Sequence, residues 1–346
     1  MNMQIVIQTL SRWYNLESRD LPWRRTRDPY CIWVSEIILQ QTRVAQGLAY
    51  YERFIAQLPD IQSLASAQEG EVLKLWQGLG YYSRARNLHK AAKMVVDDLG
   101  GVFPSTFQDI QRLPGVGLYT AAAIASFAFG EKVPAIDGNV KRVGARFFGL
   151  TDEMQSQRFL KKLFPLLQDA MAFADANEFN QAMIELGATL CSPTQPKCEI
   201  CPLESTCIAR LQHLQKQLPV VQKKQKPVNK YFYFVDFRCG DYHAIVRRSD
   251  TGIWSHLHEF PLYEGDGDHL ELSDIMNEWG VVEKIVVEGV KTVKHHLTHQ
   301  TIHAKCWYLC LPDNKFVQKD GWMWLDKEAI LLLPLHRLME KMIKFT

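Results

Sequence analysis

Apolar positions along the first two thirds of the chain repeat at the spacing of amphipathic helices. In residues 30–44, the apolar side chains Trp33, Ile37 and Ile38 follow this spacing and predict one helix. Asp28 followed by Pro29 is typical of a helix start, because Asp caps the first turn and Pro fits its φ angle. The same spacing predicts further helices over residues 71–76, 85–99, 119–129 and 179–190.

The pattern changes after residue 215. Residues 216–229 combine lysines and prolines with few core-forming side chains, which is the composition of a linker. Short runs of β-type residues follow at 231–237, 244–247, 284–287 and 302–310, with helical patterns at 270–279 and 335–344. We therefore expect a mostly α domain over residues 1–215 and an α+β domain over residues 230–346.

Length and composition agree with two globular domains. A chain of 346 residues with 47% hydrophobic residues is too long for one ordinary core. It has no apolar run long enough to span a membrane, and its start lacks the features of a signal peptide. We expect a monomer in the bacterial cytosol, without membrane contact.

The net charge of +2 hides an asymmetry between the two parts. Residues 1–228 contain 26 Lys and Arg against 21 Asp and Glu, and the remainder contains 14 against 17. A mildly basic first part fits a polyanion such as DNA, but ordinary solvated charge explains it equally well.

Four cysteines fall within seventeen residues at the spacing C-x6-C-x2-C-x5-C: Cys191, Cys198, Cys201 and Cys207. Thiolates gathered on one short loop suit a soft-metal centre, either zinc or an iron–sulfur cubane. The other four cysteines are scattered, and we interpret them as small buried apolar residues. The uneven spacing of the first four resembles the cluster loop of the endonuclease III superfamily of DNA glycosylases. That resemblance implies a [4Fe–4S] cluster held by the loop at residues 191–207.

A glycine-rich turn separates two helical patterns within residues 106–130. Gly115, Val116 and Gly117 let the backbone turn tightly, and the N–H groups at the start of the next helix suit a phosphate oxygen. This predicts a helix-hairpin-helix that grips DNA without reading its sequence, although a plain helical connection would look the same. Asp137 follows roughly twenty residues later and completes the hairpin-plus-aspartate signature of the same superfamily.

Two carboxylates are candidates for breaking an N-glycosidic bond. That reaction passes through an oxocarbenium-like state, which needs a proton for the leaving base and a carboxylate near the sugar. Glu36 lies in an apolar segment that would raise its pKa and keep it protonated, and Asp137 is the candidate carboxylate. Periodicity alone is also compatible with Glu36 as a charge at the rim of an amphipathic helix.

Several longer segments resemble the adenine DNA glycosylase family. They are residues 21–30, 33–44, 78–88 and 179–187, and the resemblance extends over nearly all of residues 10–210. In that family the residue matching Glu36 protonates adenine N7, and the residue matching Asp137 stabilises or captures the sugar cation.

The resemblance implies further site residues. Tyr119 and Asn139 match residues that support the two carboxylates. The positions expected to line the adenine pocket are Trp23, Arg24, Gln181 and Ile184. The positions expected to contact the lesion and fill the gap in the base stack are Gln41, Thr42, Leu79 and Tyr81. For Leu79 and Tyr81, simple turn packing is the alternative.

One expected residue type is missing. Related glycosylases that also cut the DNA backbone carry a Schiff-base lysine on the helix after the hairpin, whereas this chain has Tyr119 and Thr120 there and no lysine before Lys132. We therefore predict a monofunctional enzyme that removes adenine from double-stranded DNA at A:8-oxoguanine or A:G mispairs. It would leave an abasic site and so begin base excision repair.

The second domain carries a Nudix-like segment at residues 252–261, which begins Gly-Ile-Trp and ends Glu-Phe-Pro. A Nudix hydrolase needs a helix rich in glutamates to hold magnesium, and residues 270–280 lack it. We expect this domain to bind the oxidised guanine. The family's Phe-Ser-His lesion loop aligns with Lys294, His295 and His296, so His296 keeps the histidine and His295 replaces the serine. Histidines on an exposed strand, or a metal site, are the alternatives for this cluster.

Three other functions fit parts of the sequence. A bifunctional pyrimidine glycosylase would need the missing lysine. A non-catalytic damage-binding or redox-signalling protein would have lost Glu36 or Asp137, and both are present. A nucleotide hydrolase would need the missing metal helix.

Overall fold

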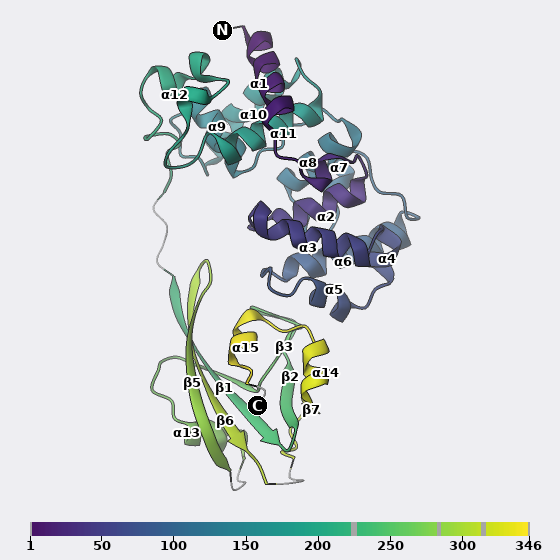
Figure 1. The fold of residues 1–346 in the computed structure, drawn as a ribbon, viewed down its shortest axis with the longest axis vertical. Coiled ribbons are helices and arrows are strands. Elements are labelled where there is room, and N and C mark those ends of the chain that lie inside the picture. The colour runs from purple at the N-terminus through teal and green to yellow at the C-terminus, as the bar shows by residue number, and fades with distance from the viewer. Residues whose placement is uncertain (1, 223–226, 282–284, 313–315, 345–346) are drawn as a thin grey trace. The chain divides into compact units, whose positions relative to one another are not determined.

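The chain is helical up to residue 211, as drawn in Figure 1. The structure is a computed structural model that describes residues 2–222, 227–281, 285–312 and 316–344. The helices of this part are α1 (Met3–Glu17), η1 (Pro22–Arg24), α2 (Pro29–Leu39), α3 (Val44–Gln57), α4 (Ile61–Ser66), α5 (Glu69–Leu75), α6 (Ser83–Asp98), α7 (Phe107–Ile110), α8 (Leu118–Phe129), α9 (Gly138–Phe147), α10 (Gln157–Met171), α11 (Ala176–Thr189), η2 (Cys198–Ile200), η3 (Glu204–Thr206) and α12 (Ile208–Leu211).

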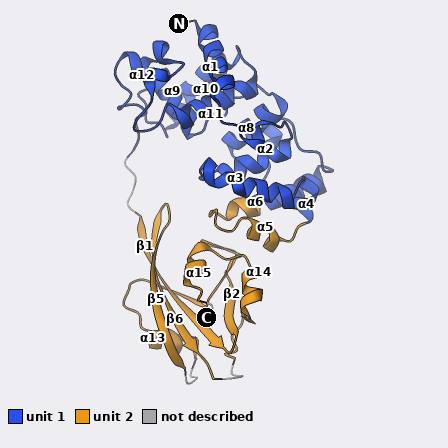
Figure 2. Cartoon of the chain, in the orientation of Figure 1, with its two compact units in different colours: residues 1–66, 87–223 blue, residues 67–86, 224–346 orange. Residues whose placement is uncertain are grey.

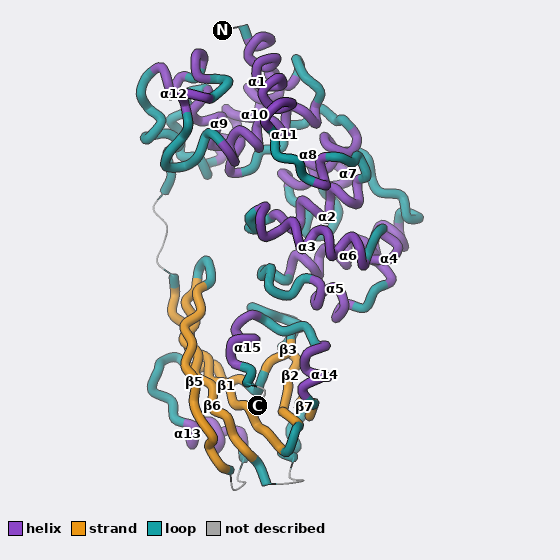
Figure 3. The backbone as a smooth tube through the Cα atoms, in the orientation of Figure 1, coloured by secondary structure: helices purple, strands orange, loops and turns teal. Residues whose placement is uncertain are grey.

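Strands follow from residue 228, and Figure 3 shows the change from helix to strand along the backbone. The elements are β1 (Val228–Cys239), β2 (Tyr242–Arg247), β3 (His258–Glu259), β4 (Leu262–Gly265), α13 (Leu272–Trp279), β5 (Val286–His296), β6 (Gln300–Cys310), β7 (Trp322–Leu325), α14 (Lys327–Leu332) and α15 (Arg337–Met342). Five strands follow one another in the order β3-β2-β1-β6-β5, and β4 and β7 pair with β1 and β2. The sheet is mixed, because β1 and β6 run parallel and the other pairs are antiparallel.

The chain divides into two compact units, coloured separately in Figure 2. Unit 1 comprises residues 1–66 and 87–223, and unit 2 comprises residues 67–86 and 224–346. The segment with α5 and the glycine turn at residues 78–80 therefore groups with the sheet. Among the described residues, no helix is both long and apolar enough to cross a bilayer.

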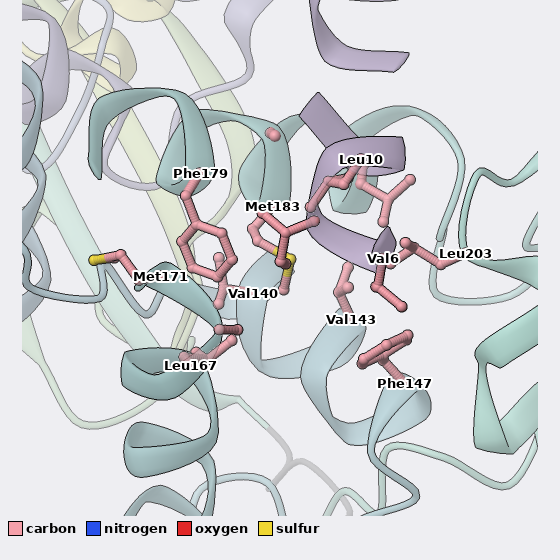
Figure 4. Close-up of a cluster of buried hydrophobic side chains, with 14 of the residues drawn as sticks. Val6, Leu10, Val140, Val143, Phe147, Leu167, Met171, Phe179, Met183 and Leu203 are labelled. Carbon is pink, nitrogen blue, oxygen red and sulfur yellow. The ribbon is translucent and has the colours of Figure 1, made fainter. Parts of the chain in front are cut away.

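A core of buried side chains from α1, α9, α10 and α11 holds one part of unit 1 together. Figure 4 shows Leu10, Val143 and Met183 within this cluster. The helices start where the sequence supplies caps, since the side chains of Asp137, Ser156 and Asp175 accept N–H groups from the first turns of α9, α10 and α11. The cap of α9 is thus also a candidate catalytic residue.

The central strand β1 of the sheet in unit 2 is buried on both faces. Alternate residues of β1 point to opposite sides, so Phe232 and Phe234 pack with α15, whereas Tyr233 and Phe237 pack with α13. Such two-sided burial explains why the β1 segment lacks the alternation of apolar and polar residues that a half-exposed strand shows.

Two details differ from the expected elements. The helix predicted over residues 30–44 is confirmed up to Leu39, but its predicted end is wrong, because α2 ends there and α3 begins at Val44. Gln41 between them has a φ of 58°, a left-handed conformation that no α-helix can continue through. Of the strand expected at residues 284–287, Lys284 lies outside the described residues, and β5 begins at Val286.

The expected linker begins with a packed segment. Leu218 is buried, and its carbonyl accepts a hydrogen bond from Arg146 Nε at 2.8 Å. The backbone N–H of Met154 donates to the carbonyl of Val220 at 2.9 Å. Residues 223–226 of the expected linker lie outside the described residues.

Candidate active site

A cavity of about 360 Å³ opens in unit 1 between α2, α8, α11 and the start of α9. Its volume falls in the range of small-molecule sites, so it can take a single base. Ten of the predicted site residues line it: Trp23, Arg24, Glu36, Gln41, Thr42, Tyr119, Asp137, Asn139, Gln181 and Ile184. Residues far apart in the sequence therefore meet in one place.

Glu36 is buried in α2, with 6% of its surface exposed. Burial raises the pKa of its carboxyl to about 7, and the nearby charge of Asp137 acts in the same direction. The hydroxyl of Tyr119 donates a hydrogen bond to this carboxyl and, together with the charge of Arg24, partly offsets the rise. The carboxyl therefore holds its proton to a much higher pH than an exposed glutamate does.

Asp137 faces the same cavity from the N-terminus of α9. Its Oδ1 accepts the Val140 N–H at 2.7 Å, and its Oδ2 accepts Asn139 Nδ2 at 2.8 Å. Burial raises the pKa of this carboxyl, whereas these hydrogen bonds and the charge of Arg142 lower it. The two carboxyls thus have different surroundings, since only Asp137 is held by a helix cap and an amide.

Arg19 and Arg24 of the cavity wall are held by a buried glutamate that we did not predict. Glu185 of α11 is fully buried and accepts Arg19 Nε and Arg24 NH2 at 2.7 Å each. Arg24 NH1 also donates to the carbonyl of Arg19 at 3.0 Å. Burial raises the pKa of Glu185, but the two guanidiniums outweigh it and hold the pKa below its usual value. The sequence signal that could have indicated a buried Glu185 is its place in a largely apolar helix, four positions after Gln181.

Arg142 connects Asp137 with the cysteine loop. Its NH2 donates to Asn139 Oδ1 at 2.8 Å, and its Nε donates to the carbonyl of Cys191 at 2.8 Å. The buried Arg146 holds the same loop through the carbonyls of Ser192 and Pro193 and lies 3.3 Å from Cys191 Sγ. The two arginines therefore fix the start of the loop against α9.

The four predicted cysteine ligands line one small cavity together. In the described residues, no group of three or more His, Cys, Asp or Glu side chains is arranged around a single metal position. Four thiols around one cavity suit either a single soft metal ion or an iron–sulfur cluster. Burial raises the pKa of Cys201 to about 12, so this thiol is protonated at neutral pH unless a bound metal displaces the proton.

The predicted hairpin lies directly before α8. Gly115 has a φ of 76°, and a Cβ there would come within 2.6 Å of the Asn87 Cβ, so both its backbone and its packing require glycine. A Cβ on Gly117 would meet nothing within 4 Å. Gly117 caps α8 without a side-chain acceptor, which leaves the first N–H groups of the helix available to an anion.

Leu79, Tyr81 and His296 do not line the cavity of Glu36. They line a second cavity of about 450 Å³, which lies within unit 2. Tyr81 has a φ of 49° and is 48% exposed, so a strained turn presents its ring to solvent. Leu79 is buried.

The expected lesion loop at Lys294–His296 lies at the end of β5 rather than in the turn. His296 pairs with Thr301 of β6, and the Leu297 N–H donates to the carbonyl of Gln300 at 2.8 Å. Thr298 therefore stands in the turn, where its hydroxyl hydrogen-bonds to that of Tyr81. Reading the sequence as Leu-Thr-His, with a hydroxyl before the histidine, could have found this residue.

Comparison with known proteins shows the family of the whole chain. An adenine DNA glycosylase from Buchnera aphidicola subsp. Baizongia pistaciae is 34% identical over 353 residues, covering 100% of this chain and 99% of that protein. The chain belongs to the adenine DNA glycosylase family. The human adenine DNA glycosylase is 47% identical over 219 residues, covering 61% of this chain and 40% of the human protein.

Domain comparisons confirm the expected fold class. Residues 34–166 match the profile of the HhH-GPD superfamily base excision DNA repair protein, and residues 232–345 match the NUDIX domain. A solved non-covalent endonuclease III–DNA complex has the same fold over 62% of this chain and 100% of its own, with a TM-score of 0.52 and 22% identity. The chain is thus a glycosylase built from an endonuclease III fold and a Nudix-like domain.

Proposed function

We propose that the enzyme hydrolyses the N-glycosidic bond of adenine mispaired with 8-oxoguanine, or with guanine, in double-stranded DNA. The observation that carries this proposal is the meeting of Glu36 and Asp137 in one base-sized cavity, with surroundings that differ. An acid with a pKa of about 7 beside a hydrogen-bonded carboxylate is the pair that this reaction needs. By family resemblance, the acid protonates adenine N7.

Each of the cavity residues would have its own role in the release of adenine. Glu36 gives its proton to the base, so that the bonding electrons leave with a neutral purine. Asp137 stands on the same cavity wall as Asn139 and stabilises the cationic sugar until water adds to C1′. Tyr119 holds the Glu36 carboxyl by its hydrogen bond. Trp23, Arg24, Gln181 and Ile184 would form the adenine pocket.

The enzyme would be monofunctional and leave an abasic site. None of the described residues that line the cavity is a lysine, and the position after the hairpin holds Tyr119 and the buried Thr120. Without an amine nucleophile no Schiff base forms, and β-elimination does not follow.

DNA would be held by the hairpin at Gly115, Val116 and Gly117, with Gln41 and Thr42 at the mouth of the first cavity. A base has to leave the duplex to reach Glu36, and Leu79 and Tyr81 would fill the gap. We place the reading of 8-oxoguanine at the second cavity, with Thr298 supplying the hydroxyl and His296 lying nearby. In this proposal residues 230–346 bind the lesion without hydrolysing nucleotides, and residues 1–215 carry out the cleavage in the bacterial cytosol, as a monomer.

Cys191, Cys198, Cys201 and Cys207 would hold a [4Fe–4S] cluster. Four thiols on one cavity fit that group, and the clamp of Arg142 and Arg146 on the loop supports it. When bound, the cluster would supply cross-linking of the loop rather than a step in base release.

Single-turnover excision tests the proposal. Duplexes carrying adenine opposite 8-oxoguanine, guanine or thymine are incubated with the wild type and with Glu36→Gln. We expect adenine release from the first two duplexes, and loss of release with the variant. Backbone nicking without alkali or heat would contradict the monofunctional assignment. Intact binding without release by the wild type would indicate a non-catalytic damage-binding protein.

A further inference from the structure

Tyr14 of α1 touches two walls of the adenine cavity without lining it. Its hydroxyl donates to Gln181 Oε1 at 2.9 Å. Its ring lies under the Arg24 guanidinium, whose central carbon is 5.6 Å from the ring centroid. Gln181 and Arg24 line the cavity, whereas Tyr14 is not among its lining residues. Tyr14 can therefore affect a bound base only through these two neighbours.

The Gln181 amide is held at both of its ends. Oε1 accepts the Tyr14 hydroxyl, and Nε2 donates to Asn177 Oδ1. Ser18 hydrogen-bonds to the Tyr14 oxygen. Burial raises the pKa of Tyr14, so its hydroxyl stays protonated and donates a hydrogen bond to Gln181. Because Oε1 accepts the Tyr14 hydroxyl while Nε2 donates to the side-chain carbonyl oxygen of Asn177, the two contacts together favour one of the two amide orientations.

Amide orientation matters for the choice of base. Adenine presents an amino donor at N6 beside ring-nitrogen acceptors, and a glutamine amide can complement this pattern with both of its ends. A reversed amide complements the opposite pattern of donors and acceptors. A cavity that holds the amide in one orientation therefore discriminates among purines more strongly than one in which the amide turns freely.

We infer that Tyr14 is a positioning residue for base specificity, which acts by locking the Gln181 amide and supporting Arg24. This inference rests on the proposed excision of adenine. Arg24 is already held by Glu185 and by the Arg19 carbonyl, so the hydroxyl of Tyr14 acts mainly on Gln181.

The test compares Tyr14→Phe with the wild type on two duplexes, one with adenine and one with unsubstituted purine, which lacks the N6 amino group. The variant keeps the ring under Arg24 and loses only the hydroxyl. We expect the preference for adenine over purine, measured as the ratio of single-turnover rates, to fall about tenfold, in keeping with one lost hydrogen bond. Tyr14→Leu, which also removes the ring, should reduce adenine excision further.

A double-mutant cycle tests whether Tyr14 acts through Gln181. If Tyr14 acts through Gln181, Tyr14→Phe should change the ratio little when Gln181→Leu is already present. Equal slowing on both duplexes, or effects that multiply in the double variant, would overturn the inference and leave Tyr14 a structural residue. Thermal melting of each variant controls for folding. Absence of adenine release by the wild type would reject the proposed function, and this inference with it.

Discussion

The cavity around Glu36 and the cavity beside Tyr81 are built from different kinds of structure. The first lies between helices, and buried contacts hold its charged groups: Glu185 behind the wall pairs with Arg19 and Arg24, and Asp137 accepts two hydrogen bonds. The second is lined mostly by turns, in which Tyr81 and Trp254 have φ angles of 49° and 57°, together with the ends of β5 and β6 and parts of α6 and α15. Trp254 is in turn supported by a stack on the buried His336, at 4.1 Å between ring centroids.

This difference separates the expected effects of substitution. Helix-borne side chains held by buried partners keep reacting groups in place, so changes in the first cavity should alter the rate of base release. Side chains aimed by turns offer contacts to a ligand, so changes in the second cavity should alter affinity and selectivity. Substitutions in the two cavities and the pH dependence of base release test that separation.

Asp137→Asn should reduce the single-turnover rate of adenine release by a factor of about 10²–10⁴, because the sugar cation loses its carboxylate. Asn is as good a helix cap as Asp, so α9 should still form and the melting temperature should stay near that of the wild type. Release within tenfold of the wild-type rate would remove Asp137 from the mechanism.

The rate of release should fall with rising pH through about 7. Glu36 acts as an acid, and its raised pKa means that the active protonated form is complete below about 6 and is lost above 7. Once that pKa is passed, the rate should drop about tenfold per pH unit, to roughly 100-fold by pH 9. The measurement is single-turnover release between pH 5.5 and 9 at constant ionic strength. A profile that stays flat to pH 9 would contradict a titrating Glu36.

The sequence predicted the parts of the site that local patterns carry. The cysteine spacing and the glycine hairpin with Asp137 after it each lie in one short segment, whereas the cap that Asp137 forms on α9 was not predicted. Contacts between distant segments were missed: Tyr14 reaches Gln181, and Arg19 reaches Glu185, across more than 160 positions. Such pairs depend on how α1 packs against α11, which local periodicity does not encode. The sequence did not show that residues 294–296 end a strand and that Thr298 stands in the following turn, because the turn is set by the pairing of β5 with β6.

Glu185→Gln should destabilise unit 1 by about 3 kcal/mol, since it leaves two guanidiniums without their buried partner. The estimate is at the low end for such pairs, because the Arg19 side chain is 39% exposed. Chemical denaturation of the full chain gives the free energy of unfolding. Asp20→Asn is the matched control: Asp20 pairs with Arg25 at the surface, and its loss should leave stability unchanged. Equal effects of the two substitutions would show that burial of the pair is not what matters.

Thr298→Val should weaken binding to duplexes with adenine opposite 8-oxoguanine by about threefold to tenfold, the value of one hydrogen bond. The substitution keeps the shape of the side chain and removes the hydroxyl that lies against Tyr81. Thr298→Ser, which keeps the hydroxyl, should bind like the wild type. Dissociation constants are best measured in the Glu36→Gln background, where adenine stays in place. The loss should be smaller when guanine replaces 8-oxoguanine, because the turn would contact the oxidised edge of the lesion. Equal losses on both duplexes would mean that Thr298 supports the turn rather than contacts the base. The residues of the second cavity would then, like those of the first, hold other side chains in place instead of distinguishing 8-oxoguanine from guanine.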